Sequence, residues 1–597
     1  MTSAPCSFPW CANGNLVQLC TRVAIAGMIT LCSGTRVYAQ VPRAEQDPAQ
    51  RLLQEQRDRD RQREIAQPAT QIEVEKPAKK SADVLSDVEQ IPEPGPIFLI
   101  HQIDILGNTV LSAEEVNEIT QAFINKSLGG TRINLLLRRF TAAFVKHGLI
   151  TTRAYLGEQN LKSGVLVITF VPGKVEAIQL NGQALSPSQS GATPDSGGLL
   201  TDLGVKLAMP TAPGELLNLT DLEQGVEQIN RMRRNKAELQ ILPGTTPGGS
   251  IIDLNNKAGD RLWLTAGVDN YGSQQTGLNR SRFGIEADNA LGFQEVLSLN
   301  YSGSRETNAL VASASVPYGY NTFSYTTSMS EYQSLISDTA LLYGNTTGSS
   351  WAWNRVLSRS QSAKTAIDTS LSLRRADRDI NDLTLTPQKL SVLRVGINTL
   401  QRFLVRQQPA TLTLEAGVSR GLSAFGADQD SAGIQSDEAH SQFTKLDFNG
   451  TLSTALPTVA SASLTFKSQI NGQWSNQALF GSEQIFVGGM SSVRGFRESD
   501  ISGDRGIYAR NEVIWANAPH LGDVQLEPYA FFDIGMTELI SEQHTRKISG
   551  LGVGVRLQLQ QGKHGWSSEL TLGRPVQQPD DVEQKGTLLL ATLNWSY

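Results

Sequence analysis

The dominant feature of this sequence is an alternation of apolar and polar residues that begins near residue 258 and continues to Tyr597. Neighbouring side chains of an extended strand point to opposite faces, so each alternating segment has one apolar and one polar face. The pattern therefore predicts a long series of strands that are each buried on one face only. The apolar positions of four such segments are Leu262, Leu264, Ala266 and Val268; Leu412, Leu414, Ala416 and Val418; Leu551, Val553, Val555, Leu557 and Leu559; and Leu589, Ala591, Leu593, Trp595 and Tyr597.

Two architectures bury one face of many such strands. In water they form a β-sandwich, whereas in a membrane they close into a barrel with lipid outside and a polar lumen inside. After the first 40 positions no window approaches the roughly 20 apolar residues of a membrane-spanning helix, so any membrane role falls to strands. The segment 258–597 has room for roughly 16 strands of about 10 residues. Together with the secretory prefix described next, this favours a transmembrane antiparallel β-barrel.

The first 39 residues have the composition of a secretory signal peptide. Arg22 precedes a short apolar run over 23–31, and Val37-Tyr38-Ala39 offers a small-residue cleavage site. An uncleaved anchor fits less well because the run is too short to span a bilayer, and lipidation at Cys32 conflicts with the bulky residue before it. Cleavage would leave a mature chain without disulfides or cysteine metal sites, because the only cysteines are Cys6, Cys11, Cys20 and Cys32.

Residues 40–66 are expected to contain an amino-terminal helix. Its part 44–66 is polar nearly all round, with Leu52, Leu53 and Ile65 as its only large apolar side chains and with Arg57 and Arg61 among its charges. Such a helix lies in water or in a polar cavity, so it is either a solvated linker or a plug inside an aqueous lumen. The proline-rich stretch within 67–96 is typical of a flexible linker.

Two compact α/β units are expected at 97–172 and 173–254. In the first, Ser112 and Glu115 form a capping box at a helix start, a second helix ends near Gly148, and two strands follow. In the second, a strand over 175–180 precedes another capping box at Thr220 to Glu223, and glycines and prolines over 243–250 predict a turn between the last two strands.

The sequence contains little that indicates catalysis. A net charge of -6 excludes a strongly basic polymer binder and hence a nucleic-acid partner. No nucleophile elbow, phosphate loop or metalloprotease motif is present, and no two histidines have metal-ligand spacing, so neither a cofactor, a metal nor an enzymatic activity is expected. Gly550-x-Gly552-x-Gly554 resembles half of a dinucleotide fingerprint, but it lies inside an alternating segment and is interpreted as strand glycine.

One motif resembles a known family. Val493-Arg494-Gly495-Phe496 is similar to the VRG(Y/F) loop signature of outer-membrane proteins that combine POTRA domains with a barrel. The surrounding stretch, from Gly481 to Glu512, resembles the branch that serves two-partner secretion, the haemolysin secretion/activation transporters. Two α/β units, rather than five, also match this branch, and the likeness covers nearly the whole mature chain.

The resemblance implies a fold and a function. A barrel of about 16 strands in the Gram-negative outer membrane would follow two periplasmic POTRA domains, and it would export, and thereby activate, a large β-rich exoprotein such as a haemolysin or adhesin. The POTRA domains would receive the partner's amino-terminal secretion domain, the amino-terminal helix would plug the barrel, and the signature loop would fold into the lumen. Further implied partners are outer-membrane lipid and, during biogenesis, the barrel assembly machinery and periplasmic chaperones.

The resemblance also assigns residues to the lumen. Arg494 of the loop would pair with Asp533 in a barrel-wall motif that includes Phe531 and Gly535. A companion wall motif would contain Gly550, Gly554 and Arg556. Phe496 departs from the tyrosine often found at this position, which removes a hydroxyl and keeps an aromatic ring. The alternatives from other classes are an assembly factor that inserts other barrels and a passive porin.

Overall fold

The computed structural model describes residues 46–66, 88, 91–185, 202–257, 259–337, 340–381, 383–497, 501–582, 584 and 586–597. The predicted signal peptide, residues 1–39, and most of the predicted linker lie outside the described residues. No described helix has both the length and the apolar composition needed to cross a membrane.

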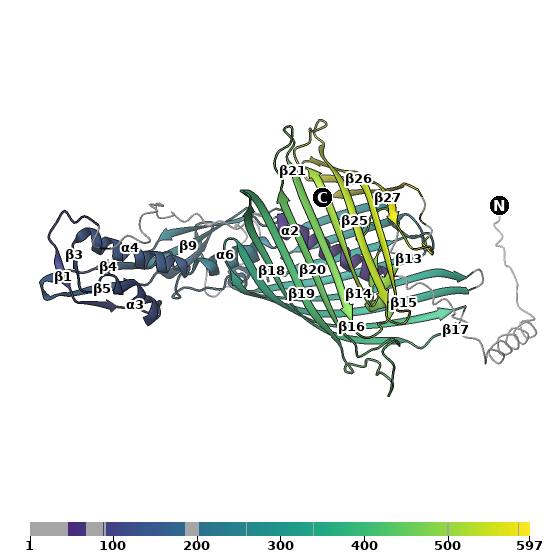
Figure 1. Ribbon diagram of the computed structural model, residues 1–597, viewed down its shortest axis with the longest axis horizontal. Helices are drawn as coiled ribbons and strands as arrows, with labels where there is room; N and C mark the ends of the chain where they lie inside the picture. Colours follow the sequence, from purple (N-terminus) through teal and green to yellow (C-terminus); the bar gives the residue numbers. More distant parts are fainter. Residues whose placement is uncertain are drawn as a thin grey trace, which may run out of the picture. The chain divides into compact units, whose positions relative to one another are not determined.

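Sixteen antiparallel strands form a closed barrel in the part of the chain that the structure describes (Figure 1). Each strand pairs with the next along the chain, and the last pairs with the first, from Thr265 opposite Ser596 to Asp269 opposite Thr592. A two-residue strand, β17 (Leu383–Thr384), lies beside β16. The barrel strands are β10 (Leu262–Asp269), β11 (Arg280–Asp288), β12 (Val296–Gly303), β13 (Thr307–Tyr318), β14 (Asn321–Ser337), β15 (Ala340–Arg359), β16 (Ala363–Ile380), β18 (Gln388–Val405), β19 (Gln408–Gly421), β20 (Thr444–Ala455), β21 (Leu464–Ser475), β24 (Arg505–Trp515), β25 (Gln525–Leu539), β26 (His544–Gln561), β27 (His564–Gln577) and β28 (Leu588–Ser596).

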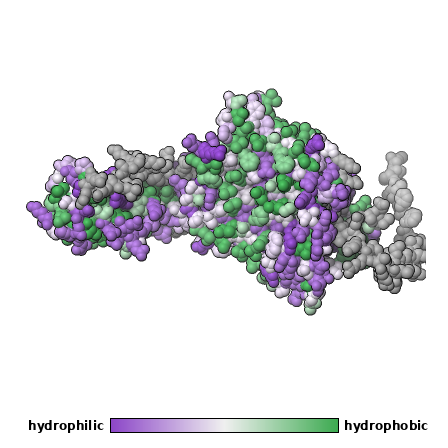
Figure 2. Space-filling view, in the orientation of Figure 1, coloured by the Kyte–Doolittle hydropathy of each residue, from purple (hydrophilic) through white to green (hydrophobic). Residues whose placement is uncertain are grey.

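The alternating pattern determines which face of each strand meets lipid. On β14, Phe323, Tyr325 and Met329 are exposed on the outside, whereas Ser324 and Thr326 between them line the interior. Hydrophobic side chains accordingly gather over the outer surface of the barrel strands in Figure 2. Because such a surface is stable in lipid and a closed barrel leaves no unpaired edge, the predicted barrel of about 16 strands is confirmed.

The first α/β unit contains β1 (Phe98–Ile100), β2 (Gln102–Leu106), α3 (Ala113–Gln121), β3 (Lys126–Leu128), α4 (Gly130–Lys146), β4 (Arg153–Leu156), the 3-10 helix η2 (Leu161–Ser163) and β5 (Val165–Val171). Its three-stranded sheet has the order β2-β5-β4, with β2 parallel to β5. Phe140 and Phe144 of α4 pack edge-on against Phe170 of this sheet, each with ring centroids 4.9 Å apart. These contacts form the core of the unit.

Both predicted ends of the helices in this unit agree with the structure. The Ser112 and Glu115 capping box is present at the start of α3, and Gly148, just after α4, has a left-handed backbone conformation with a φ of 80°. His147 joins the two helices through a 2.7 Å hydrogen bond to Glu115. That bond, with those from Ser112, lowers the pKa of Glu115 to about 2.

The second α/β unit contains β6 (Lys174–Leu180), β7 (Gln183–Ala184), α5 (Asp202–Ala208), α6 (Leu219–Asn230), β8 (Ala237–Pro243) and β9 (Gly249–Asn256), with sheet order β7-β6-β9-β8. The predicted capping box at Thr220 is wrong. Asn218 caps α6 instead, because its side-chain oxygen accepts the Thr220 N–H at 2.9 Å. Glu223, the expected partner in the box, is buried and faces Arg359 of the barrel.

Helix α6 also holds the second unit against one turn of the barrel, between β13 and β14. Gln224 and Gln228 both donate to the carbonyl oxygen of Gly319, at 3.3 and 2.9 Å. Just after the helix, Arg231 donates to the Ser315 hydroxyl at 2.5 Å and to the Gln294 carbonyl at 2.8 Å. Burial lowers the pKa of Arg231 to about 10.

Helix α2 (Pro48–Ala66) lies inside the barrel (Figure 1). Asp47 caps it by accepting the Ala49 N–H at 2.8 Å. The sequence predicted a helix without an apolar core to join, and this is wrong at one end, because Ala49 and Leu52 are buried against Ala309 and Val311 of β13. The remainder of the helix is polar and faces the lumen.

Candidate functional site in the barrel lumen

The segment between β21 and β24, residues 476–504, folds back into the barrel and is called the lumen loop here. Its described part contains the 3-10 helix η3 (Gly481–Glu483) and a two-stranded sheet of β22 (Ile485–Val487) and β23 (Ile501–Gly503). Val493 and Phe496 are fully buried in a cluster with Tyr508 and Ile548 of the barrel wall. The loop is therefore packed against the wall by an apolar anchor, as well as by the charges described next.

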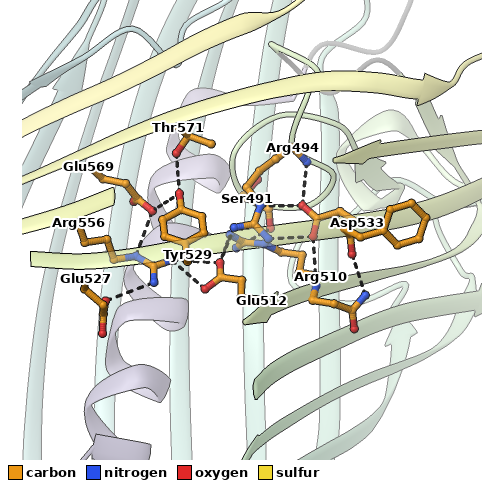
Figure 3. A network of polar contacts seen from close by, with 12 residues as sticks. Ser491, Arg494, Arg510, Glu512, Glu527, Tyr529, Asp533, Arg556, Glu569 and Thr571 are labelled. Carbon is orange, nitrogen blue, oxygen red and sulfur yellow. Dashed lines mark hydrogen bonds and ion pairs between the residues drawn. The ribbon is translucent and has the colours of Figure 1, made fainter. Parts of the chain in front are cut away.

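Arg494 is the largest fully buried side chain among the described residues, and its charge is paired by two carboxylates (Figure 3). Its Nε and Nη2 donate to the two oxygens of Asp533, at 2.6 and 2.8 Å, and its backbone N–H donates to the same carboxylate at 3.1 Å. Its Nη1 donates to Glu512. This fork of charge-assisted bonds fixes both the position and the orientation of the guanidinium.

Aromatic rings cover the same guanidinium. The Arg494 Cζ lies 4.1 Å from the centre of the Phe531 ring and 5.7 Å from that of Tyr529. Phe531, Tyr529 and Asp533 alternate along β25, so all three project into the lumen from one strand. Cation–π contacts at a desolvated site add to the carboxylate pairing, so the guanidinium of Arg494 is held by two carboxylates and two aromatic rings.

A second arginine extends the network. Arg556 of β26 pairs with Glu512 at 2.9 Å and with Glu569 at 3.1 Å, and it lies 4.2 Å from the Tyr529 ring. The Tyr529 hydroxyl contacts Glu569 at 2.8 Å and Thr571 at 2.6 Å. Glu512 is thus shared by Arg494 of the loop and Arg556 of the wall, and it connects the two predicted motifs (Figure 3).

Glycines in the wall let the loop backbone approach this closely. A Cβ on Gly550 would overlap the carbonyl oxygen of Arg494, and one on Gly535 would lie 2.6 Å from Val487. Gly495 has a φ of 102°, and a Cβ on it would lie 2.7 Å from the backbone of Arg574. Gly554 instead makes room for the Tyr529 ring. Gly535 and Gly550 of the wall are therefore steric requirements of the docked loop.

Helix α2 contacts both the lumen loop and the wall. Gln50 donates to the carbonyl oxygen of Ser482 in the loop at 2.8 Å. Glu55 pairs with Arg280 of β11 at 3.0 Å, and Arg61 pairs with Glu415 of β19 at 3.2 Å. Near its last turn, Glu64 pairs with Lys364 of β16. The helix is therefore held by ionic contacts to strands on different sides of the lumen.

A cavity of about 1670 Å³ remains between helix, loop and wall. Arg57 and Arg61 of α2 line it, together with Glu483 and Phe486 of the loop. The described residues contain no group of three or more His, Cys, Asp or Glu side chains that could hold a metal ion.

The structure brings most of the predicted site residues together, in two sets. Arg494, Phe531, Asp533 and Arg556 meet in the network, whereas Leu52 of α2 lies apart from them and packs against β13. Sequence reasoning did not single out Glu512, Tyr529, Glu569 or Thr571. Glu512 is the last residue of the stretch that resembles the family. Its position on the inward-facing side of β24 could have indicated that it lies in the lumen.

A closed 16-stranded barrel, two small α/β units before it and an arginine loop inside it define an outer-membrane transporter with POTRA domains. The chain belongs to the haemolysin secretion/activation protein family (ShlB/FhaC/HecB), whose pattern matches residues 248–557. POTRA-domain patterns match residues 98–173, in the ShlB-type form, and residues 174–243.

Individual relatives agree with this family. The outer membrane transporter CdiB of Dickeya dadantii is 32% identical over 85% of this chain and 89% of its own length. The hemolysin transporter protein HpmB of Proteus mirabilis is 29% identical over 84% of this chain and 87% of its own length. The solved structure of CdiB from Escherichia coli covers 93% of this chain and 99% of its own, with a TM-score of 0.78 and 27% identity.

The family confirms the predicted function and location. The chain is an outer-membrane transporter that exports a partner exoprotein by two-partner secretion, and its POTRA domains are of the kind that are periplasmic in this family. The turn of the barrel that α6 contacts therefore lies at the periplasmic end, and the opposite ends of the strands face the outside.

Proposed function

We propose that α2 and the lumen loop close this transporter at rest, and that a large β-rich exoprotein, haemolysin-like or adhesin-like, displaces α2 when it is exported. The single observation that carries the proposal is the burial of Arg494 between Asp533 and Glu512. A long loop that is inserted in a pore needs such a clamp, because otherwise water and cargo would displace it. The clamp fixes the loop against the barrel wall, so the loop can stay attached while α2 moves.

The two α/β units, residues 97–172 and 173–254, are the receiving domains in this proposal. Each has a small sheet whose outer strands, β4 and β8 for example, have a free edge within that sheet. Such an edge accepts an extended segment through main-chain hydrogen bonds, so an unfolded amino-terminal secretion domain is a suitable ligand. Residues 1–39 act as the signal peptide, 40–66 as the plug, 67–96 as the linker and 258–597 as the barrel.

The proposal also covers catalysis, cofactors and the factors that insert the transporter into the membrane. Its lumen network has the character of a structural clamp, with every predicted residue engaged in packing or ion pairing, so we assign it no enzymatic step and no cofactor. Outer-membrane lipid surrounds the barrel, and the barrel assembly machinery and periplasmic chaperones serve its insertion. A passive porin would have no use for two receiving domains.

Replacement of Arg494 by alanine tests the proposal. The variant is expected to insert as a heat-modifiable barrel, because Arg494 belongs to the loop and not to a barrel strand, but to secrete little partner exoprotein into the medium. Arg497→Ala is the matched control, since this loop arginine makes only a 3.1 Å hydrogen bond to the Asn270 carbonyl. Normal secretion by Arg494→Ala would remove the proposed role of the clamp.

A further inference from the structure

A neutral stretch of four adjacent strands lies between charged strands in the wall of the lumen. Among the described residues that line the cavity, β12, β13, β14 and β15 contribute no charged side chain. In contrast, β11, β16, β18, β19 and β20 each contribute at least one Arg, Lys, Asp or Glu. The neutral side is rich in hydroxyl groups and is called the hydroxyl wall; its representative side chains are Ser298, Ser313, Ser324, Thr326, Ser328 and Ser350.

The two sides have different uses in the closed state. The charged side holds the parts that close the pore, since Arg280 and Glu415 bind α2, and Arg374 and Lys445 both bind Glu483 of the lumen loop. Within the described residues, the hydroxyl wall makes no ion pair with either part. Its serines bond to one another instead, as Ser298 and Ser313 do at 2.7 Å.

Chemistry makes the hydroxyl wall suitable for a moving polypeptide. A hydroxyl group both donates and accepts, and it rotates to suit its partner, so it can bond to the backbone of any extended sequence. Each such bond replaces a bond to water, so its net gain is small. Buried ion pairs, in contrast, would hold charged cargo residues in place and slow their release.

A polypeptide already lies on this wall in the closed state. Asp47, the cap of α2, accepts a hydrogen bond from the Ser330 hydroxyl of β14 at 2.8 Å. Ala49 and Leu52 pack on Ala309 and Val311 of the neighbouring strand β13. The first turns of the plug thus occupy the outer half of the hydroxyl wall, so withdrawal of the plug exposes that surface along its length.

The periplasmic end of the hydroxyl wall meets the second POTRA domain. Gln228 of α6 donates to the Thr322 hydroxyl at 3.3 Å, and Thr322 is the first inward hydroxyl of β14. Arg231 donates to Ser315, which lines the same cavity from β13. A chain released from the second POTRA domain would therefore meet the hydroxyl wall as it enters the lumen.

We propose that the exported exoprotein crosses the barrel as an extended chain along the hydroxyl wall of β12 to β15, while the charged side keeps hold of the lumen loop. The inference rests on the proposed function, since it gives a route to the exoprotein that the open transporter exports. It also fits the contacts of β13 and β14, the two neutral strands that touch both the second POTRA domain and the start of α2. The route runs from Thr322 past Ser328 to the outer ends of β14 and β15.

Cysteine cross-linking to a stalled cargo tests the route in the full-length transporter. The chain has no cysteine after Cys32, so single cysteines can be placed at Ser324 and Ser350 on the hydroxyl wall. The control positions are Asn398 of β18 and Asn471 of β21, which also line the cavity and are similarly half-buried. Each is replaced by a single cysteine in the same way. The probe is an amino-terminal fragment of the partner exoprotein, carrying single cysteines and fused to a tightly folded domain that cannot enter the pore.

The expected result is disulfide formation that is about tenfold stronger at Ser324→Cys and Ser350→Cys than at the two asparagine positions, the ratio that a preference of ~1.4 kcal/mol produces. Thr327→Cys, on the outer face of β14, sets the background. Equal or stronger cross-links at β18 and β21 would overturn the route, although the cargo would still be in the lumen as the proposed function requires. Secretion without any cross-link in the lumen would overturn both.

Discussion

Arg494 shows at the scale of one residue how a buried charge can fix a mobile loop. A guanidinium without partners is costly in a desolvated site, whereas one with two carboxylates is stable there. Asp533 accepts from the side chain and backbone of Arg494 and also from the Asn511 N–H at 3.1 Å. An exchange of Arg494 and Asp533 would therefore restore little function, because an arginine at 533 cannot accept the backbone hydrogen bonds that the carboxylate accepts.

A second prediction at this scale concerns Gly550. In Gly550→Ala the new methyl group would overlap the Arg494 carbonyl oxygen, so the loop would have to move away from the wall. Overpacking of this kind typically costs about 1–3 kcal/mol. We expect secretion to fall while the heat-modifiable barrel is retained; Gly157→Ala, where the added methyl meets nothing within 4 Å, is the control. Wild-type secretion by Gly550→Ala would show that close docking of the loop is dispensable.

At the scale of elements, Lys364 links three parts of the molecule. It lies on β16 and pairs with Glu64 near the end of α2 and with Glu227 of α6, the latter at 2.9 Å. Arg359 of β15 also binds Glu227. The end of the plug, the barrel and the second POTRA domain therefore share one cation, so movement of α6 would weaken the attachment of α2.

Lys364→Met keeps the length of the side chain and removes this link. Since Glu64 is 41% exposed, we expect the loss to be about 1 kcal/mol, or about fivefold in favour of the open pore. Single-channel recordings in planar bilayers measure the open fraction. Lys563→Met, which removes an exposed pair with Asp260, should leave it unchanged. An open fraction equal to that of the wild type in Lys364→Met would mean that Lys364 does not hold the plug.

The sequence was most informative where one short-range rule decides the structure. Alternation along 258–597 predicted the barrel, because burial on one face determines the register of every strand. Two predictions from the sequence were wrong. The capping box at Thr220 was wrong because Asn218 caps the helix, and the polar surroundings expected for α2 were wrong at Leu52, whose apolar partners lie on β13. The contact of Arg494 with Asp533 and Glu512 depends on how a loop folds back into a closed barrel, so only the family resemblance pointed to the pair.

For the whole molecule, the charge division of the lumen gives each side a separate task. The charged strands hold the lumen loop and most of α2, and the neutral strands β12 to β15 stay free of ion pairs from the plug and loop. The plug must leave the hydroxyl wall for a chain to pass, whereas the loop can remain attached by Arg494. Export is therefore expected to depend on movement of α2 above all.

A reversible lock on α2 tests this central claim most directly. Cysteines in place of Leu52 and Val311, which pack in one buried cluster, would join the helix to β13 by a disulfide in a chain without other cysteines after Cys32. The Leu52→Cys single variant is the control for the substitution itself. Under oxidising conditions the double variant should secrete no partner exoprotein, and a reductant should restore secretion within the same cells. Undiminished secretion with the disulfide formed would contradict the account, because the exoprotein would then cross the membrane with α2 still in the lumen.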